Sequence, residues 1–162
     1  MTIAEMILPE FDAEMASTRV ILALVPKQKF DWKAAESLHT IGWNANHLAE
    51  IVGWTLAIIE EDEFDIAPVD GPKHDVPSID DPSEILANFD EAVLAARASI
   101  ESATDQRLAE EWSMKMGGQI LFTMTKGSCL RTWVLNHSVH HRGILSVYLR
   151  MCGVKMTPVY DG

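Results

Sequence analysis

Three histidines lie within five positions of the segment LNHSVHHRGI, which covers residues 135–144. His137 and His141 are four residues apart, so on a helix their side chains project from adjacent turns in the same direction. Both stand on an apolar helical face where leucine would be expected, and burying neutral imidazoles without partners is costly. One divalent metal ion would bind both rings, and His-x-x-x-His on a helix is a known ligand spacing for Zn²⁺ and related ions.

The third ligand of such a site is predicted to be His47, which lies one turn before Ile51 on the apolar face of another predicted helix. If the two helices are neighbours, the three imidazoles can converge. Three protein ligands with an open position are typical of a catalytic rather than a structural site. Because imidazole must be neutral to bind a metal, the affinity is expected to fall as pH drops through roughly 6.5. The alternative is that His137 and His141 are ordinary hydrogen-bonded core residues.

The other histidines and the nearest carboxylate are predicted to have different roles. His140 lies roughly 100° around the helix from His141, which places it at the surface or behind the ligands. His39 precedes the apolar face and His74 lies in a loop, so both are expected to be solvated. Glu50, one turn after His47 on roughly the same face, is the nearest candidate for a fourth ligand, but it is interpreted as an ordinary helix carboxylate.

Four helices are predicted to position these residues. Their periodic apolar faces extend over about residues 4–25, from Ser37 or Thr40 to Glu61, 83–103 and 126–152. Pro9 is expected to kink the first helix or mark its start. Gly153 is expected to end the last helix, and the tail that follows is expected to be extended.

Two further segments connect the predicted helices. A loop from Asp65 to Pro82 contains four prolines and is expected to be a long crossover. Apolar residues two apart on either side of Gly117-Gly118 indicate a short β-hairpin before the last helix. The predicted fold class is therefore all-α, a four-helix bundle with a long crossover loop and a short β-hairpin, in one domain over residues 1–162.

The composition is that of a soluble globular protein, with 48% apolar and 23% charged residues. The formal net charge is −11, which disfavours nucleic acid as a partner. No apolar segment approaches the roughly 20 residues that span a membrane, and the acidic first residues do not resemble a signal peptide. The two cysteines, Cys129 and Cys152, are too few for a disulfide framework and are expected to be packing residues in a cytoplasmic protein.

Several motifs carry a resemblance to a known family: WNANHLAEIVGW in the second helix, LNHSVHHRGILSVYLRMCGV in the last, and the closing TPVYDG. With EFDAEMASTRVILALVP and FDWKAAESLHTIGW, these segments resemble the DinB/YfiT-like superfamily over nearly the whole chain. The resemblance implies a four-helix bundle and a three-histidine site for zinc, nickel or a similar ion. Matched motif by motif, the ligands are His47, His137 and His141.

The sequence departs from the family pattern at one place and keeps it at another. Many members have glutamine directly after His-Arg-Gly, whereas this chain has Ile144. Arg142 is retained. It is interpreted either as an ion pair that holds the last helix to a neighbouring helix or subunit, or as a residue that supports the metal site.

The resemblance also implies a function. Relatives include thiol S-transferases, so the chain is expected to be a metal-dependent enzyme that adds a low-molecular-weight thiol to a small electrophilic substrate. Trp43, Trp54, Trp133 and the Met-rich hairpin are predicted to form its pocket, although plain core packing is the alternative for several of them. A metal-dependent hydrolase and a non-enzymatic metal-binding stress protein are the alternative functions. A homodimer is expected, because relatives often pair.

Overall fold

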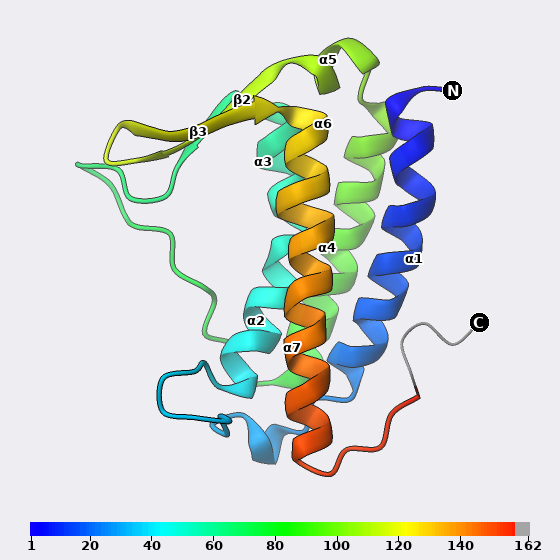
Figure 1. Ribbon diagram of the computed structural model, residues 1–162, viewed down its shortest axis with the longest axis vertical. Helices are drawn as coiled ribbons and strands as arrows, with labels where there is room; N and C mark the ends of the chain where they lie inside the picture. Colours follow the sequence, from blue (N-terminus) through cyan, green and yellow to red (C-terminus); the bar gives the residue numbers. More distant parts are fainter. Residues whose placement is uncertain (158–162) are drawn as a thin grey trace.

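Four helical segments stand side by side in the computed structural model, which describes residues 1–157 (Figure 1). They are α1 (Ile3–Ala23), α2 with α3 (Ile41–Ile51 and Trp54–Glu60), α4 (Pro82–Ser102), and a last segment made of α6 (Lys126–Cys129), η2 (Leu130–Asn136) and α7 (His137–Met151). Their apolar faces form one core, in which Phe11, Leu48, Phe89 and Leu145 are at most 1% exposed. The predicted helical bundle is thus confirmed in outline, but a small three-stranded sheet makes the all-α description incomplete.

The first helix begins with a capping box. The Thr2 hydroxyl accepts a hydrogen bond from the Glu5 amide, and the Glu5 carboxylate accepts one from the Thr2 amide. Pro9 lies inside α1, so the alternative that Pro9 marks the start of the helix is wrong. A short 3₁₀ helix, η1 (Lys27–Lys29), follows and leads into the connection to α2.

The second predicted helix begins where expected but is divided. Thr40 caps it, since its hydroxyl accepts a hydrogen bond from the Trp43 amide at 3.1 Å. The helix breaks between α2 and α3, where the Gly53 amide donates to the Glu50 carbonyl at 2.9 Å, a bond across three residues instead of four. The break lies between two helices that both line the cavity described below, α2 with His47 and α3 with Trp54.

The sheet lies beside one end of the bundle (Figure 1). Its strands are β1 (Glu63–Asp65), β2 (Glu111–Met116) and β3 (Gln119–Thr125). The central strand β2 pairs with β1 in parallel and with β3 in antiparallel orientation. A short helix, α5 (Asp105–Ala109), precedes β2. Gly117 and Gly118 form the predicted turn, with φ angles of +60° and +78°. The Asp65 carboxylate accepts hydrogen bonds from both of their amides, which attaches the hairpin tip to β1. Strand β1 was not predicted.

The proline-rich segment after β1 is the predicted crossover, and it returns along the bundle to α4 (Figure 1). Asn46 of α2 anchors it. The Asn46 side chain donates to the Ile79 carbonyl at 2.8 Å and accepts from the Ile79 amide at 3.1 Å. This reciprocal pair holds the crossover against α2 at the residue next to His47, and Asp81 then caps α4.

The last helical segment is continuous but not regular. Residues Leu130–Asn136 form a π-helix directly before His137. Such wider turns occur frequently at functional sites, and the apolar periodicity of the sequence did not indicate this one. Gly153 has a φ of +82° and ends the helix as predicted. Of the tail expected to be extended, residues 158–162 lie outside the described part of the chain.

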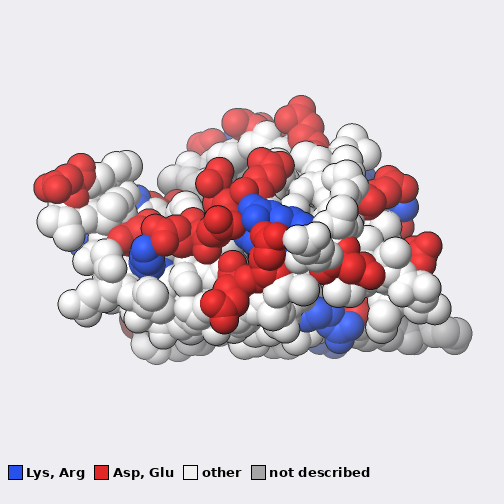
Figure 2. Space-filling view, turned by 90° about the horizontal axis from the view of Figure 1, so that it is seen from above, with Lys and Arg blue, Asp and Glu red and all other residues white. Residues whose placement is uncertain are grey.

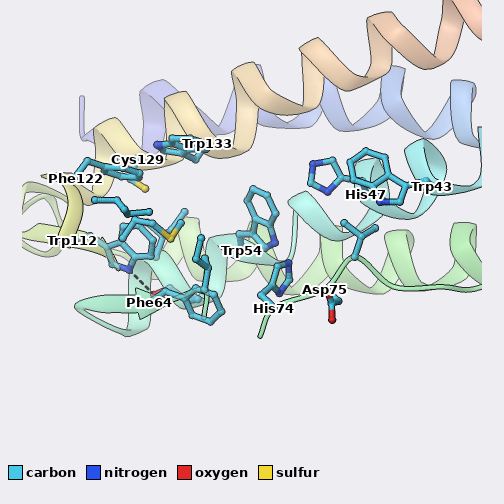
Figure 3. A pocket seen from close by; sticks show the side chains of 16 residues that line it. Trp43, His47, Trp54, Phe64, His74, Asp75, Trp112, Phe122, Cys129 and Trp133 are labelled. Atoms are coloured by element: carbon cyan, nitrogen blue, oxygen red, sulfur yellow. Dashed lines mark hydrogen bonds between the residues drawn. The ribbon is translucent and has the colours of Figure 1, made fainter. Parts of the chain in front are cut away.

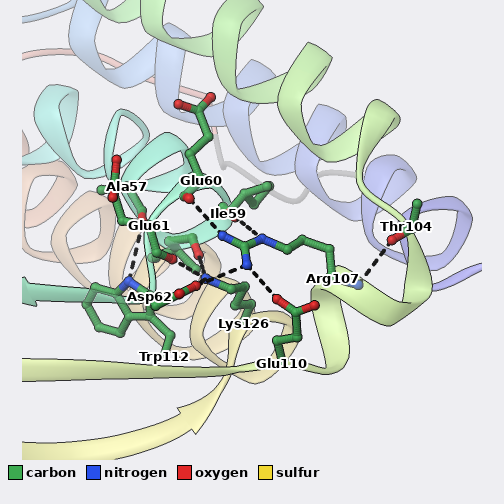
Figure 4. Close-up of polar contacts among 11 residues, drawn as sticks. Ala57, Ile59, Glu60, Glu61, Asp62, Thr104, Arg107, Glu110, Trp112 and Lys126 are labelled. Carbon is green, nitrogen blue, oxygen red and sulfur yellow. Dashed lines mark hydrogen bonds and ion pairs between the residues drawn. The ribbon is translucent and has the colours of Figure 1, made fainter.

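Two cations satisfy the carbonyl end of α3 (Figure 4). Lys126, which is fully buried, donates to the Ile58 carbonyl at 2.9 Å. Arg107 donates to the carbonyls of Ile59 and Glu60, both at 2.7 Å. The last carbonyls of a helix have no partner within the helix and carry partial negative charge, so this pair of cations stabilises the end of α3 and fixes the sheet beside it.

Acidic side chains outnumber lysine and arginine on the face shown in Figure 2, where they form patches among uncharged side chains. This arrangement agrees with the net charge of −11. No helix among residues 1–157 is both long and apolar enough to cross a membrane.

Candidate metal centre

Helices α2 and α7 bring together the three histidines predicted to be metal ligands. His47 comes from α2, and His137 and His141 come from adjacent turns of α7. One nitrogen from each ring lies within 4.8 Å of the nitrogens of the other two. Among the described residues, these three histidines are the group whose geometry suits a metal ion. The convergence expected from the sequence is therefore present, while metal binding itself stays a prediction.

The distance between two of the histidines fits one divalent ion. His47 Nε2 and His137 Nε2 are 3.4 Å apart, and two nitrogens bound to one tetrahedral zinc ion at 2.0–2.1 Å would be separated by about 3.4 Å. The Glu50 carboxylate contacts His47 Nδ1 at 2.8 Å. An N–H on Nδ1 that donates to Glu50 leaves the lone pair of Nε2 directed at the other two rings. His141 Nδ1 is buried without a hydrogen-bond partner in the described structure. A bound cation would give the His141 ring an interaction that the protein itself does not supply.

Burial keeps two of the ligands neutral. Desolvation, followed by the neighbouring charges of His47 and His140, lowers the pKa of His137 to about 4. Desolvation is also the main cause that lowers the pKa of His141 to about 3, followed by the charge of His47. A neutral imidazole is the form that binds metal. Proton competition at these two ligands is thus displaced well below the pH of roughly 6.5 expected for unperturbed histidine.

Glu50 and His74 form an outer layer that was not predicted. Besides its contact with His47, the Glu50 carboxylate lies 3.3 Å from His74 Nε2. Only 11% of the Glu50 side chain is exposed, and it contacts the outer nitrogen of a candidate ligand. His74 is about one-third exposed, as expected for a loop residue, but it also contacts Glu50. The i, i+3 spacing of His47 and Glu50 was a visible signal, whereas only the fold brings His74 to them.

Replacing Glu50 by alanine is expected to weaken metal affinity about 10- to 100-fold. The reason is that a carboxylate on the outer nitrogen of a histidine ligand fixes the ring and raises its basicity. Affinity would be measured by competition with a chromophoric chelator. Glu60→Ala, an exposed glutamate on α3, is the matched control. Equal affinities for the two variants would mean that Glu50 serves only to hold His74.

The remaining predicted residues lie outside the cluster of ligands. The Arg142 guanidinium is 2% exposed and contacts helix α1, with Glu14 Oε2 at 2.5 Å and the Glu14 carbonyl at 2.9 Å. This geometry supports the ion pair between helices rather than a role in supporting the metal site. His140 is exposed, and its ring contacts that of His141. His39 is exposed and stacks on Trp43, with ring centroids 3.6 Å apart.

A cavity of about 500 Å³ opens beside the histidines (Figure 3). His47 lines it, as do Trp43, Trp54, Trp133 and Met114 of the hairpin, so the predicted pocket walls are confirmed. Trp112, Phe122, Phe64 and the loop residues His74 and Asp75 also contribute and were not predicted. Cys129 lines the cavity as well, but burial raises the pKa of its thiol to about 12. Its thiol therefore stays protonated, in agreement with the prediction that it is not a nucleophile.

Comparisons with known proteins agree on one family. A family model described as the DinB superfamily matches residues 10–145. No curated protein matches the sequence significantly. A DinB-like protein of Bacillus cereus has a similar structure, with a TM-score of 0.73, 21% identity, and coverage of 94% of this chain and 95% of the other. A DinB-like protein of Bacillus subtilis, YjoA, has a TM-score of 0.70, 20% identity, and coverage of 94% and 96%.

A third similar structure carries a functional description. YfiT from Bacillus subtilis is described as a probable metal-dependent hydrolase with an unusual four-helix bundle topology. It has a TM-score of 0.68 and 20% identity, with coverage of 94% of this chain and 89% of YfiT. At such identities the likeness establishes the shared fold.

Proposed function

The chain belongs to the DinB superfamily, and from this membership and the geometry above we propose that it is a divalent-metal-dependent enzyme. Its ligands are His47, His137 and His141, and the ion is zinc or nickel. Imidazole nitrogen suits both ions. Three protein ligands leave at least one position for an exchangeable group.

The observation that carries the proposal is that His47 belongs both to the histidine cluster and to the wall of the cavity. A structural ion would need no cavity beside it, which weighs against the non-enzymatic alternative. When bound, the ion would lower the pKa of a coordinated thiol or water and so make it a nucleophile. The chain's own residues have supporting roles: Glu50 fixes the His47 ring, and the aromatic walls exclude water and hold the substrate.

The reaction we propose is thiol S-transfer to a small electrophilic substrate. The thiol loses its S–H proton to solvent, the sulfur forms a bond to an electrophilic carbon, and the leaving group departs with the bonding electron pair. The sulfur comes from a low-molecular-weight thiol because Cys129, the cysteine in the cavity wall, stays protonated. Hydrolysis is the second candidate: YfiT is described as a probable metal-dependent hydrolase, and a position open to a thiol is also open to water.

Cobalt substitution tests the thiol-transfer proposal. Untagged protein loaded with Co²⁺ is titrated with cysteine, glutathione and other small thiols. A thiolate bound to cobalt adds a charge-transfer band in the near ultraviolet, which is expected for at least one thiol. The band should persist in His140→Ala, whose substituted side chain is exposed, and vanish in His47→Ala. Absence of the band with every thiol would overturn S-transfer and leave hydrolysis as the proposed reaction.

Two further expectations stay predictions. Homodimerisation agrees with the large apolar side chains exposed on the first and last helices, namely Met6, Val20, Val147 and Met151. A cytoplasmic location agrees with two cysteines that are both free thiols.

A further inference from the structure

The cavity beside the histidines is lined by residues of both the sheet and the helical bundle. Residues of β2, β3 and α3 line it, together with Cys129 of α6 and Trp133 of the π-helical segment. The pairing of β2 with β3 skips Leu121, because Met114 pairs with Phe122 and Lys115 pairs with Ile120. This bulge turns two consecutive residues, Leu121 and Phe122, toward the cavity, where regular alternation would turn only one.

The lining is polar at one end only. His47, His74 and Asp75 lie at the end next to the metal ligands, whereas Trp112, Phe122 and Cys129 lie at the far end (Figure 3). Among residues 1–157, no lysine or arginine lines the cavity, and the protein as a whole carries a net charge of −11. An anionic group in the far end would therefore lose its hydration without gaining a cation.

Aromatic rings dominate the middle and the far end. The indole of Trp133 is stacked on Phe122, with centroids 5.2 Å apart and the planes 3° from parallel. The rings of Trp112 and Phe122 are 6.3 Å apart. Such surfaces bind flat apolar groups by stacking and by burial of apolar area. The volume of about 500 Å³ lies within the range of pockets that enclose a whole small molecule.

We propose that this cavity binds the uncharged, apolar and preferably aromatic body of the substrate, with the reacting group at the His47 end. The assignment of the reacting group rests on the proposed function, but binding of the apolar body does not. The substrate class is then an uncharged aromatic electrophile, and the small thiol or water approaches from the end that holds the histidines.

Three probes with one aromatic body and different charges test the proposal: naphthalene, naphthalenesulfonate and naphthyltrimethylammonium. Binding to metal-free protein is followed by the shifts of the tryptophan indole signals in NMR spectra. Naphthalene is expected to shift the signals of Trp54, Trp112 and Trp133. The signal of Trp32 should stay unchanged, because Trp32 packs on Tyr148 and does not line the cavity. The anion is expected to bind at least tenfold more weakly. Tighter binding of the anion or of the cation than of naphthalene would overturn the proposal.

A pair of variants on one strand locates the site. Met114 lines the cavity, whereas Met116, two residues along β2, does not and is 50% exposed. Met114→Glu is expected to weaken naphthalene binding at least tenfold, because it places a carboxylate in the apolar wall. Met116→Glu is expected to leave the affinity within twofold of the wild type. Equal naphthalene affinities for the two variants, each shown to be folded by its spectrum, would refute the assignment of the binding site to this cavity.

Metal content separates this proposal from the proposed function. Both methionine variants are expected to bind the same amount of metal as the wild type, because neither position is a ligand. Naphthalene binding by protein that never takes up metal would support the cavity while overturning the enzyme proposal. Full metal binding without any naphthalene binding would overturn the cavity proposal and leave the enzyme proposal standing.

Discussion

Replacing His47, His137 and His141 together by alanine is expected to abolish metal binding. The wild type, purified without a His tag and dialysed against buffer, should retain about one ion per chain, and the triple variant essentially none. The expectation rests on one nitrogen from each ring lying within 4.8 Å of the others. Elemental analysis measures the content, and thermal unfolding gives an independent readout. An ion at about a thousand times its dissociation constant stabilises the folded state by about 4 kcal/mol.

The double variant His39→Ala/His140→Ala is the matched control, because it removes two exposed histidines that flank the cluster. It should bind metal as the wild type does and should be stabilised by added metal to the same extent. The triple variant should keep its helical circular dichroism, since the packed core of the bundle is made by other residues. If the triple variant kept one ion per chain, the ligand assignment would be wrong and carboxylates elsewhere would have to supply the site.

The metal-free protein is expected to lose stability steeply below about pH 6.5. An unfolded histidine has a pKa near 6.5, whereas the folded protein lowers the pKa of His137 to about 4 and that of His141 to about 3. Above pH 6.5 both histidines are neutral in the folded and in the unfolded state, so they add no pH dependence to the stability. Below it the unfolded chain takes up protons that the folded chain does not, so stability falls as pH falls. At about pH 4.5 the loss is on the order of 3–5 kcal/mol for the two groups together.

Chemical denaturation in the presence of a chelator, from about pH 7 down to about pH 4.5, measures this loss. The variant His137→Gln/His141→Gln removes both titrating groups while it keeps side chains of similar size and polarity. Because carboxylates elsewhere titrate in both proteins, the difference between the two curves isolates the histidines. The wild-type curve is expected to fall more steeply. Parallel curves would contradict the lowered pKa values. Added Zn²⁺ should raise wild-type stability, and this gain should shrink as pH falls, because the metal and the protons compete for the same rings of the folded protein.

Local signals in the sequence were sufficient to predict much of the fold. The apolar periodicity of α4 indicated its existence and approximate ends, Thr40 was a candidate capping residue and does cap its helix, and Gly117-Gly118 made the hairpin predictable. Each of these signals depends on contacts within a few residues of the chain.

Non-local contacts decided the parts that were missed. Strand β1 has three residues and no periodicity, and it exists because β2 pairs with it. Lys126 is buried because α3 ends nearby with unpaired carbonyls, which a view of the sequence around Lys126 does not reveal. The π-helical turn contains the same residue types as a regular helix, so only packing against α3 and the sheet distinguishes it.

The sequence by itself determined the three candidate ligands, because His137 and His141 share one face of a helix and His47 stands on the apolar face of another. It did not determine what surrounds them. His74 reaches Glu50 from the crossover loop, which Asn46 holds against α2, and residues of the bulged strand and of α3 line the cavity together. Helical periodicity is a property of neighbouring residues, whereas a cavity is the space left between elements far apart in the chain. The chemistry of the ligands was therefore readable from the sequence, and the shape and polarity of the substrate site were decided by the tertiary structure.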